Sequence, residues 1–510
     1  MLVENKDRKV VPRWRDFNTT AAIGELSDPT TQPKFTLQSE GAIARRYDEW
    51  SSTKTVWHAA DLLSSAAVAD SAHRFKDVAR FVVEHQSIAP PGLLRLARTV
   101  LLPADEPALT PFQQSFTQTR KLIHLFRRRL SSEPRNSVAW ADLSRLYASI
   151  GQEKHAAHAM SVASSISPTN RFILRSAARL FLHIKDAGFA LRMIRKSPDV
   201  AIRDPWLLAA EVAVSSADGV PSFFAKKAKR VAENAGFSDF ARTELQSALA
   251  TLEMESGNTR LARRMFRNSL ACPNENSLAQ VGWAERQIGG IGVVVSNRAV
   301  PLSFEADANA AFLQGQWTTS YRNALRWIDD QPFSTRPVIL ATYLSSTILE
   351  DYAASIDILE KALGINPGNP VLINNLAFAQ ANLGNLEDAM TTLNSIKDRP
   401  VPELYAVPLL ATEGLIQMRM KQFDKGRSLY RDALDRASRV SIPRYRVGAA
   451  IHLALEEAIG RTSEAPGALK FAEKAAADLH DPDITLLLSR ARDLQREAAT
   501  ALLNGNQFPL

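Results

Sequence analysis

The sequence of 510 residues contains a single cysteine, Cys272, so no disulfide bond can form within the chain. A chain with so little cysteine is typical of a reducing compartment. No stretch approaches the ~20 consecutive apolar residues that a membrane-spanning helix needs. The opening MLVENKDRK is charged where a signal peptide would be apolar. These absences predict a cytoplasmic protein that does not cross a membrane.

Side chains suited to catalysis or metal binding are scarce as well. The chain has nine histidines, of which His155 and His158 could share one helix face, but no third ligand stands near them in sequence. The GGIG at 289–292 lacks the Lys-Ser or Lys-Thr pair and the preceding strand of a phosphate-binding loop. The motifs GxSxG, HExxH and CxxC are absent. The sequence therefore predicts no catalytic residue, no metal site and no cofactor.

The charge balance is mildly basic. Lys and Arg number 62 against 54 Asp and Glu, which gives a net charge of +8 and a pI near 9.5. Such an excess favours an acidic protein partner, a nucleic acid or another anionic surface. Hydrophobic residues at 45% and charged residues at 23% are typical of a folded protein.

The chain does contain an internal repeat. Between residues 336 and 396 two units lie end to end, and their matched positions are thirty-four residues apart. Small residues permit two helices to cross closely, and bulky residues fill the grooves alongside. The matched residues are Ile339, Tyr343, Ser346, Ser355, Leu359, Ala362 and Pro367 in the first unit, and Ile373, Ala377, Gln380, Ala389, Leu393 and Ile396 in the second.

This pattern resembles the tetratricopeptide repeat, a helix–turn–helix unit of ~34 residues. The best single match consists of Trp140, Leu143, Ser144, Tyr147, Gly151, Ala156, Met160, Ala163 and Pro168. The resemblance implies an all-α fold, a superhelix of paired helices (an α-solenoid) in two sub-arrays. The opening Pro12–Phe17 is also similar to openings of bacterial tetratricopeptide-repeat proteins that accompany nuclease-type toxins.

Changes in composition and periodicity divide the chain into six parts. A Thr-, Ser- and Pro-rich start predicts an extended arm, and glycines followed by valines predict an irregular junction in the middle of the chain. A final amphipathic helix would cover the last apolar face of the second array. The predicted parts are an arm at 1–54, a helical region at 55–111, a first array at 112–285, the junction at 286–303, a second array at 304–483, and a capping helix with a tail at 484–510.

The N-terminal arm contains more large apolar residues than a linker needs. It is either a poorly ordered tail or an arm that packs on this protein or on a partner. We predict that Arg13, Trp14, Arg15 and Phe17 contact a protein partner.

In tetratricopeptide arrays the first helix of each pair lines the concave face. This register predicts that Asn374, Asn375, Phe378 and Asn382 line a concave groove. Amide side chains can bond the backbone of an extended peptide or contact a partner helix. The alternative is a face that is only solvated.

Basic residues recur at matched places on the second helices of the first array. They predict a basic ridge along the convex side, made by Arg127, Arg192, Arg195, Lys226, Lys227, Arg264 and Arg267. Such a ridge suits phosphates or an acidic partner, although solvated cations are the alternative.

The sequence leaves two main functions open. The first is a non-catalytic scaffold or adaptor that binds a protein partner through the concave groove and the N-terminal arm. The second is a regulatory or targeting subunit of a nuclease or another nucleic-acid enzyme, which contacts phosphates or an acidic partner through the basic ridge. An enzyme within residues 1–135 is a third reading, for which no acid, base or nucleophile pattern is present.

Overall fold

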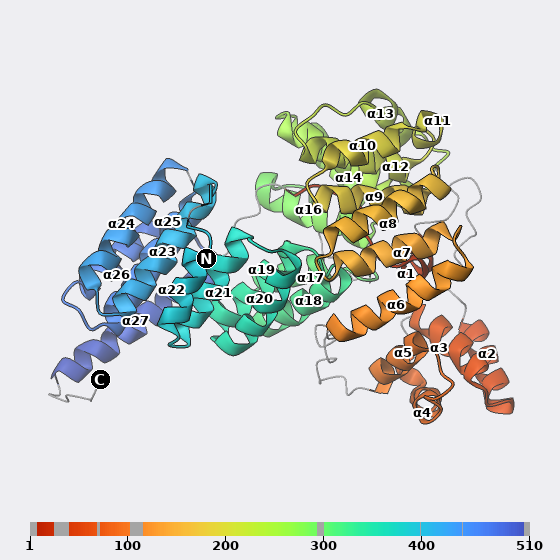
Figure 1. Ribbon diagram of the computed structural model, residues 1–510. Coiled ribbons are helices and arrows are strands. Elements are labelled where there is room, and N and C mark those ends of the chain that lie inside the picture. The colour runs from red at the N-terminus through yellow and green to blue at the C-terminus, as the bar shows by residue number, and fades with distance from the viewer. Residues whose placement is uncertain are drawn as a thin grey trace.

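The computed structural model describes residues 8–24, 40–68, 72–101, 116–292, 300–397, 399–440 and 442–503. All regular structure in these ranges is helical, so the predicted all-α repeat superhelix is confirmed. Figure 1 shows two lobes of stacked helices joined near the middle, with a smaller group of helices below the first lobe. No helix of the described ranges is long and apolar enough to cross a membrane.

The smaller group forms a core of its own, from Ile43 to Val100. This group begins at α2 (Glu40–Ser52), inside the stretch 1–54 that the sequence predicts as an extended arm. Its helices are α2 (Glu40–Ser52), α3 (Val56–Val68), η1 (Ala72–Arg74), α4 (Lys76–Glu84) and α5 (Pro91–Leu101). The arm also contains one short helix, α1 (Phe17–Ala22), which Asp16 caps by accepting a hydrogen bond from the backbone N–H of Thr19.

The first lobe is the first array. Helices pair as inner and outer members, and the inner helices α7, α9, α12, α14 and α16 stack on one another. Its helices are α6 (Phe116–Ser132), α7 (Ser137–Ala148), α8 (Glu153–Ile166), α9 (Arg171–His183), α10 (Ala187–Arg195), α11 (Pro198–Ala201), α12 (Pro205–Ala217), α13 (Ala225–Glu233), α14 (Asp239–Glu255), α15 (Thr259–Ser269) and α16 (Glu275–Ile288).

The second lobe is the second array, built in the same way. Its helices are α17 (Phe304–Leu313), α18 (Trp317–Asp330), α19 (Thr335–Tyr343), the π-helical turn η3 (Leu344–Ile348), α20 (Tyr352–Ile365), α21 (Pro370–Asn382), α22 (Leu386–Asn394), α23 (Glu403–Arg419), α24 (Phe423–Arg439), α25 (Pro443–Ile459), α26 (Ala465–Ala475) and α27 (Pro482–Leu503).

At the predicted junction, α16 ends at Ile288 and Gly289 follows with a positive φ of 59°. Two arginines of the outer helix α15, Arg263 and Arg267, hold the end of α16. Arg263 donates to the carbonyl oxygens of Ile288 (2.6 Å) and Gly289 (2.8 Å), which satisfies carbonyls that no helical N–H reaches. The three valines that the sequence places in this junction lie outside the described residues.

The second array closes on itself through its last helix. Tyr343, at the end of α19, donates its hydroxyl hydrogen to Asp483 of α27 at 2.5 Å. Arg490, also of α27, donates to the carbonyl oxygens of Thr347 and Ile348 in the π-helical turn. The C-terminal helix therefore covers the end of the array and also reaches back to its earlier repeats.

Close helix crossings in the repeats depend on small residues, as the sequence pattern predicts. In the α23–α24 pair, a Cβ added to Gly426 would lie 2.3 Å from Cγ of Met418 and 2.9 Å from the carbonyl oxygen of Gly414. Both distances are shorter than any real Cβ contact, so the two helices can cross here only over glycine.

We predict that Gly426→Ala destabilises the second array by ~1–3 kcal/mol, because the added methyl overpacks the crossing. Gly467→Ala in α26 is the matched control, because a Cβ there meets nothing within 4 Å. Removing that glycine should raise stability by up to ~1 kcal/mol through helix propensity. Thermal unfolding of both variants measures this, and equal midpoints would contradict the packing account.

Candidate functional site

Asn374 and Asn375 of α21 lie inside the second array, only 2% and 5% exposed. The amide of Asn375 donates to the hydroxyl of Thr342 on α19 (3.2 Å), and Thr412 on α23 donates to the amide oxygen of Asn374 (2.9 Å). These two asparagines thus join three successive inner helices by buried hydrogen bonds. A role in partner binding stays a prediction for them.

Phe378 and Asn382 lie one and two turns further along α21. Phe378 is buried and borders a cavity of about 10 Å³, room for about one water, beside Thr412 and His452. Asn382 is half-buried, and Arg419 of α23 donates to its side-chain oxygen at 3.2 Å. The inner face of the second array is therefore packed at this point.

The N-terminal segment takes a different place. Residues 8–16 form neither helix nor strand, and α1 follows; we call residues 8–17 the strap. Its side chains pack against both arrays at the place where the two lobes meet. We call the surface that contacts it the strap site, which comprises Asp142, Arg145, Phe172, Glu275, Asn276, Gln280, Glu305, Asp330 and Phe333.

Amide side chains of α16 hold the backbone of the strap. Gln280 donates to the carbonyl oxygen of Arg8 at 2.8 Å, and Asn276 donates to that of Val11 at 2.9 Å. On the far side, Arg145 of α7 donates to the carbonyl oxygen of Trp14 at 3.1 Å. These bonds depend on the extended backbone and hardly at all on side-chain identity.

Three strap arginines pair with buried carboxylates. Arg8 donates to both oxygens of Glu305 in α17, at 3.0 and 2.9 Å, and is itself buried. Arg15 donates to both oxygens of Asp330 at the end of α18, at 2.5 and 2.9 Å, and to Glu275 of α16 at 2.7 Å.

Arg13 supplies the third pair and also contacts Glu305. Burial by itself would raise the pKa of Glu305, but the guanidinium groups of Arg336, Arg8 and Arg13 lower it well below its ordinary value. Glu305 is therefore ionised at every physiological pH, and its charge is balanced from both the strap and α19.

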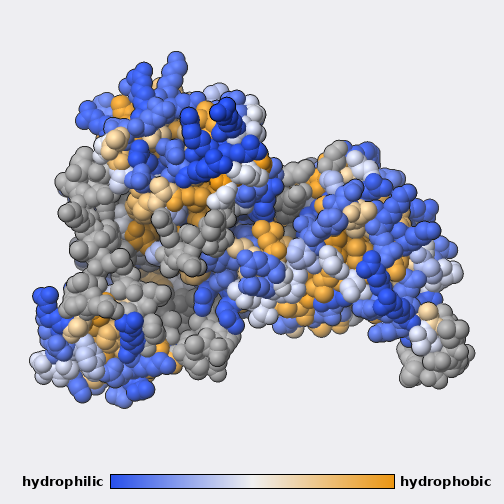
Figure 2. All heavy atoms as spheres, turned by 180° about the vertical axis from the view of Figure 1, so that it is seen from behind, coloured by the Kyte–Doolittle hydropathy of each residue, from blue (hydrophilic) through white to orange (hydrophobic). Residues whose placement is uncertain are grey.

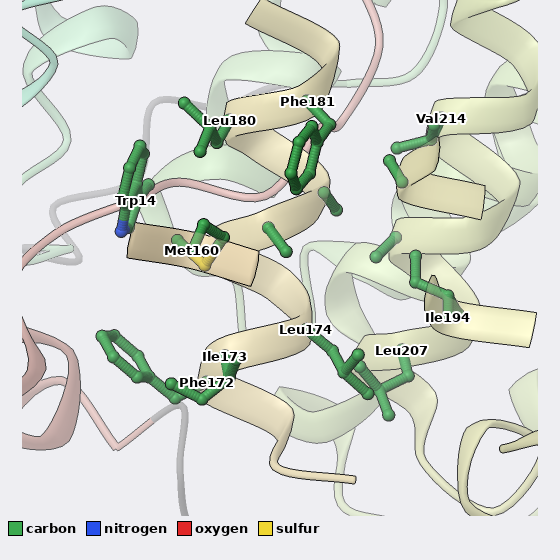
Figure 3. Packing of buried hydrophobic residues seen from close by; sticks show 14 of the residues in the cluster. Trp14, Met160, Phe172, Ile173, Leu174, Leu180, Phe181, Ile194, Leu207 and Val214 are labelled. Atoms are coloured by element: carbon green, nitrogen blue, oxygen red, sulfur yellow. The ribbon is translucent and has the colours of Figure 1, made fainter. Parts of the chain in front are cut away.

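Aromatic contacts complete the site. The ring of Trp14 is fully buried, with its centroid 5.4 Å from that of Phe333, and Phe17 meets Phe172 of α9 edge to face at 5.3 Å. Figure 3 shows Trp14 on the N-terminal segment, in the cluster that contains Met160 and Leu180. The predicted arm residues Arg13, Trp14, Arg15 and Phe17 are thus brought together, and each contacts this chain.

Sequence reasoning missed the residues that receive the strap. Glu275, Asn276 and Gln280 stand on one stretch of α16, and Glu305 and Asp330 are 25 residues apart in the second array. The available signal was the carboxylates themselves, because a carboxylate that the helix packing buries needs a cationic partner.

The residues of the predicted ridge lie on outer helices, and several of them have partners within this chain. Lys226, Lys227 and Arg264 are exposed and form no ion pair among the described residues. Arg127 on α6 is also exposed, and the guanidinium of Arg192 lies over the ring of its neighbour on α10.

Two ridge arginines have structural partners. Arg195 is half-buried and donates to the wholly buried Glu211 at 2.6 and 3.0 Å, a pairing that the ridge prediction did not include. Arg267 donates to the carbonyl oxygens of Gly290 and Ile291, so it helps Arg263 to hold the end of α16. The contacts of these two arginines within this chain explain why they are present without a partner from outside.

No cluster of three or more His, Cys, Asp or Glu that could hold a metal ion occurs within the described ranges. A family model described as tetratricopeptide repeat matches residues 348–406, which include α20, α21 and α22. These residues therefore match a tetratricopeptide repeat, as the sequence predicts for this part of the chain. The bacterial type and the similarity to companions of nuclease-type toxins stay predictions.

Comparison with curated protein sequences gives no significant match. Similar solved structures include yeast Tom70 (12% identity, 77% of this chain and 96% of that chain, TM-score 0.30). They also include the Cut9–Hcn1 hetero-tetramer of the APC/C (11%, 94% and 99%, 0.41) and a human IFIT1 dimer with PPP-AAAA (12%, 90% and 95%, 0.32). At these identities and scores, the likeness carries no functional argument.

The strap site contains one group that titrates near neutrality. Burial and then the charge of Asp16 raise the pKa of Asp142 to about 7, although the backbone N–H of Phe17 donates to it. Because an unfolded aspartate titrates near ~3.9, the folded chain holds this proton more tightly. The stabilisation is complete below ~3.9 and is lost as the pH rises to about 7.

We predict that Asp142→Asn removes this pH dependence, because an amide oxygen can still accept from Phe17 and carries no charge. The unfolding midpoint of the native chain should fall relative to the variant between pH 5 and about 7, then stay parallel to it at higher pH. Thermal scans across pH 5–9 measure the difference. A difference that is constant over the whole range would contradict the assignment.

Proposed function

We propose that this chain is a non-catalytic cytoplasmic scaffold, and that it binds a protein partner as an extended segment at the strap site. The observation that carries the proposal is the strap itself. A surface between the arrays already holds an extended segment by its backbone carbonyls and by its side chains. Binding of this kind needs no chemistry from the scaffold.

The contact lies at the strap site, because the alternative inner face of the second array is packed. Asn374, Asn375 and Phe378 are buried among neighbouring helices, and α27 closes that array. These residues and Asn382 would take part in binding only if the second array opened. The strap residues Arg13, Trp14, Arg15 and Phe17 belong to the proposed site as its present occupant.

The test uses the full chain with a protease site inserted between Asp28 and Pro29, which is cut after folding. Washing then lets residues 1–28 leave the strap site. We predict that the cut chain retains a specific protein from the cells of origin, that the uncut chain does not, and that excess synthetic peptide of residues 8–24 releases it. Identical retention by cut and uncut chains, or no release by the peptide, would contradict the proposed function.

A second function, that of a regulatory or targeting subunit that contacts phosphates or an acidic partner, is supported by the charge of the outer helices. Helices α10, α13 and α15 carry ten Lys or Arg residues and one acidic residue, Glu233. The corresponding α20 and α22 of the second array carry four acidic residues and one lysine. Hydrophilic side chains gather over the lobe that contains α10–α15, as seen from behind (Figure 2).

The matched test reverses charges that have no structural partner. We predict that Lys226→Glu, Lys227→Glu and Arg264→Glu together abolish salt-sensitive binding to bulk nucleic acid and leave the fold intact. Arg195 and Arg267 stay unchanged in this variant, because they pair with Glu211 and with the end of α16. Affinity of the native chain should fall with salt by a log–log slope of about −0.9 per phosphate on duplex DNA.

The control variant reverses three exposed charges on α24 of the second array: Lys425→Glu, Arg431→Glu and Arg439→Glu. It changes the net charge by the same amount, so it should keep nearly all of the binding if the ridge is the site. Equal loss in both variants would show a general charge effect, and absence of binding by the native chain would end this second candidate.

A further inference from the structure

The strap arginines make contacts that a lysine could not make. Arg8 uses two edges of its guanidinium: the pair of bonds to Glu305 and a further bond to Asn276 at 3.1 Å. Arg15 likewise holds Asp330 with two parallel bonds and Glu275 with its remaining nitrogen. A planar fork matches a carboxylate in this way, and a lysine ammonium does not.

Each of these arginines also touches both arrays. Arg8 lies between Asn276 of α16 and Glu305 of α17, and Arg15 lies between Glu275 of α16 and Asp330 of α18. The receiving carboxylates, Glu275, Glu305 and Asp330, stand at fixed distances from one another and come from both lobes. An occupant must be extended and must present its arginines at matching intervals.

The contacts do not require the occupant to be joined to this chain. Side chains of the repeats make the bonds to the strap backbone at Arg8, Val11 and Trp14. A separate segment of the same sequence could make every one of them. The charges are complementary as well, since the three receiving carboxylates are each less than a tenth exposed and face guanidinium groups.

We infer that the strap site is a recognition site for an arginine-bearing extended segment of a protein partner, with arginines at the intervals of Arg8, Arg13 and Arg15 around a central aromatic, and that residues 8–17 occupy it in cis. This rests on the proposed function and adds the chemistry of the partner and the regulation of access. The cis segment competes at the millimolar effective concentration of a short tether, so a partner binds only when the strap leaves.

The test uses the full chain with the inserted protease site, cut after folding, and fluorescent peptides of residues 8–24. The native peptide should exchange into the site with saturable binding. A peptide with Arg8→Lys and Arg15→Lys has the same charge and should bind at least about tenfold more weakly, because the forked contacts are lost. The uncut chain should bind the native peptide at least about a hundredfold more weakly than the cut chain.

Two chain variants locate the binding. Asp330→Asn and Glu305→Gln should each lower the affinity for the native peptide by about tenfold or more. Asp330 is the last residue of α18, so its variant is expected to fold even if Glu305→Gln does not. In that case Asp330→Asn alone tests whether the peptide binds here. The Lys425→Glu, Arg431→Glu, Arg439→Glu chain is the control that should leave the affinity unchanged.

The outcomes separate the inference from the proposed function. Equal affinity of the native and lysine peptides would overturn recognition by arginine, while an extended segment would still be bound. A cut chain that keeps its own strap and takes up no peptide would overturn both. Dimers that form from the uncut chain by exchange of straps would show that the occupant is a second copy, which contradicts the partner assigned here.

Discussion

The arrangement of the two arrays depends on buried carboxylates that only distant parts of the chain can neutralise. Glu305 begins α17 and is bound by Arg8, which stands 297 residues earlier, and by Arg336. An unpaired charge in such a place costs several kcal/mol. The strap, or another segment that presents the same arginines, must therefore occupy this place for α16, α17 and α18 to pack together, and its contacts join the second lobe to the first.

Much of the architecture could be predicted from the sequence, because repeat positions are local. The thirty-four-residue spacing predicts helix pairs with small residues at their crossings, and the structure shows such a crossing at Gly426 beside Gly414. The all-α superhelix and the tetratricopeptide repeat at 348–406 follow from the same pattern. Positions that recur at a fixed period carry their structural role in the sequence itself.

The site could not be predicted to the same depth, because its contacts join residues hundreds of positions apart. Repeat register assigns Asn374 to an inner helix but does not predict its burial, or its hydrogen bond from Thr412 of α23. It likewise gives no sign that Arg195 is needed by the buried Glu211. The large apolar residues of the arm indicate that it packs against a protein surface, and Trp14, which lies in the core of the first array, packs against this chain.

The strap must occupy the strap site in solution, and limited digestion with trypsin tests this most directly. Arg13 and Arg15 are trypsin sites inside the strap, whereas Arg203 lies in an exposed turn of the first array. We expect the bond after Arg203 to be cut first and the bonds after Arg13 and Arg15 much more slowly, because the strap spends most of its time in the strap site. Cleavage in the strap as early as at Arg203, read by mass spectrometry, would contradict the account.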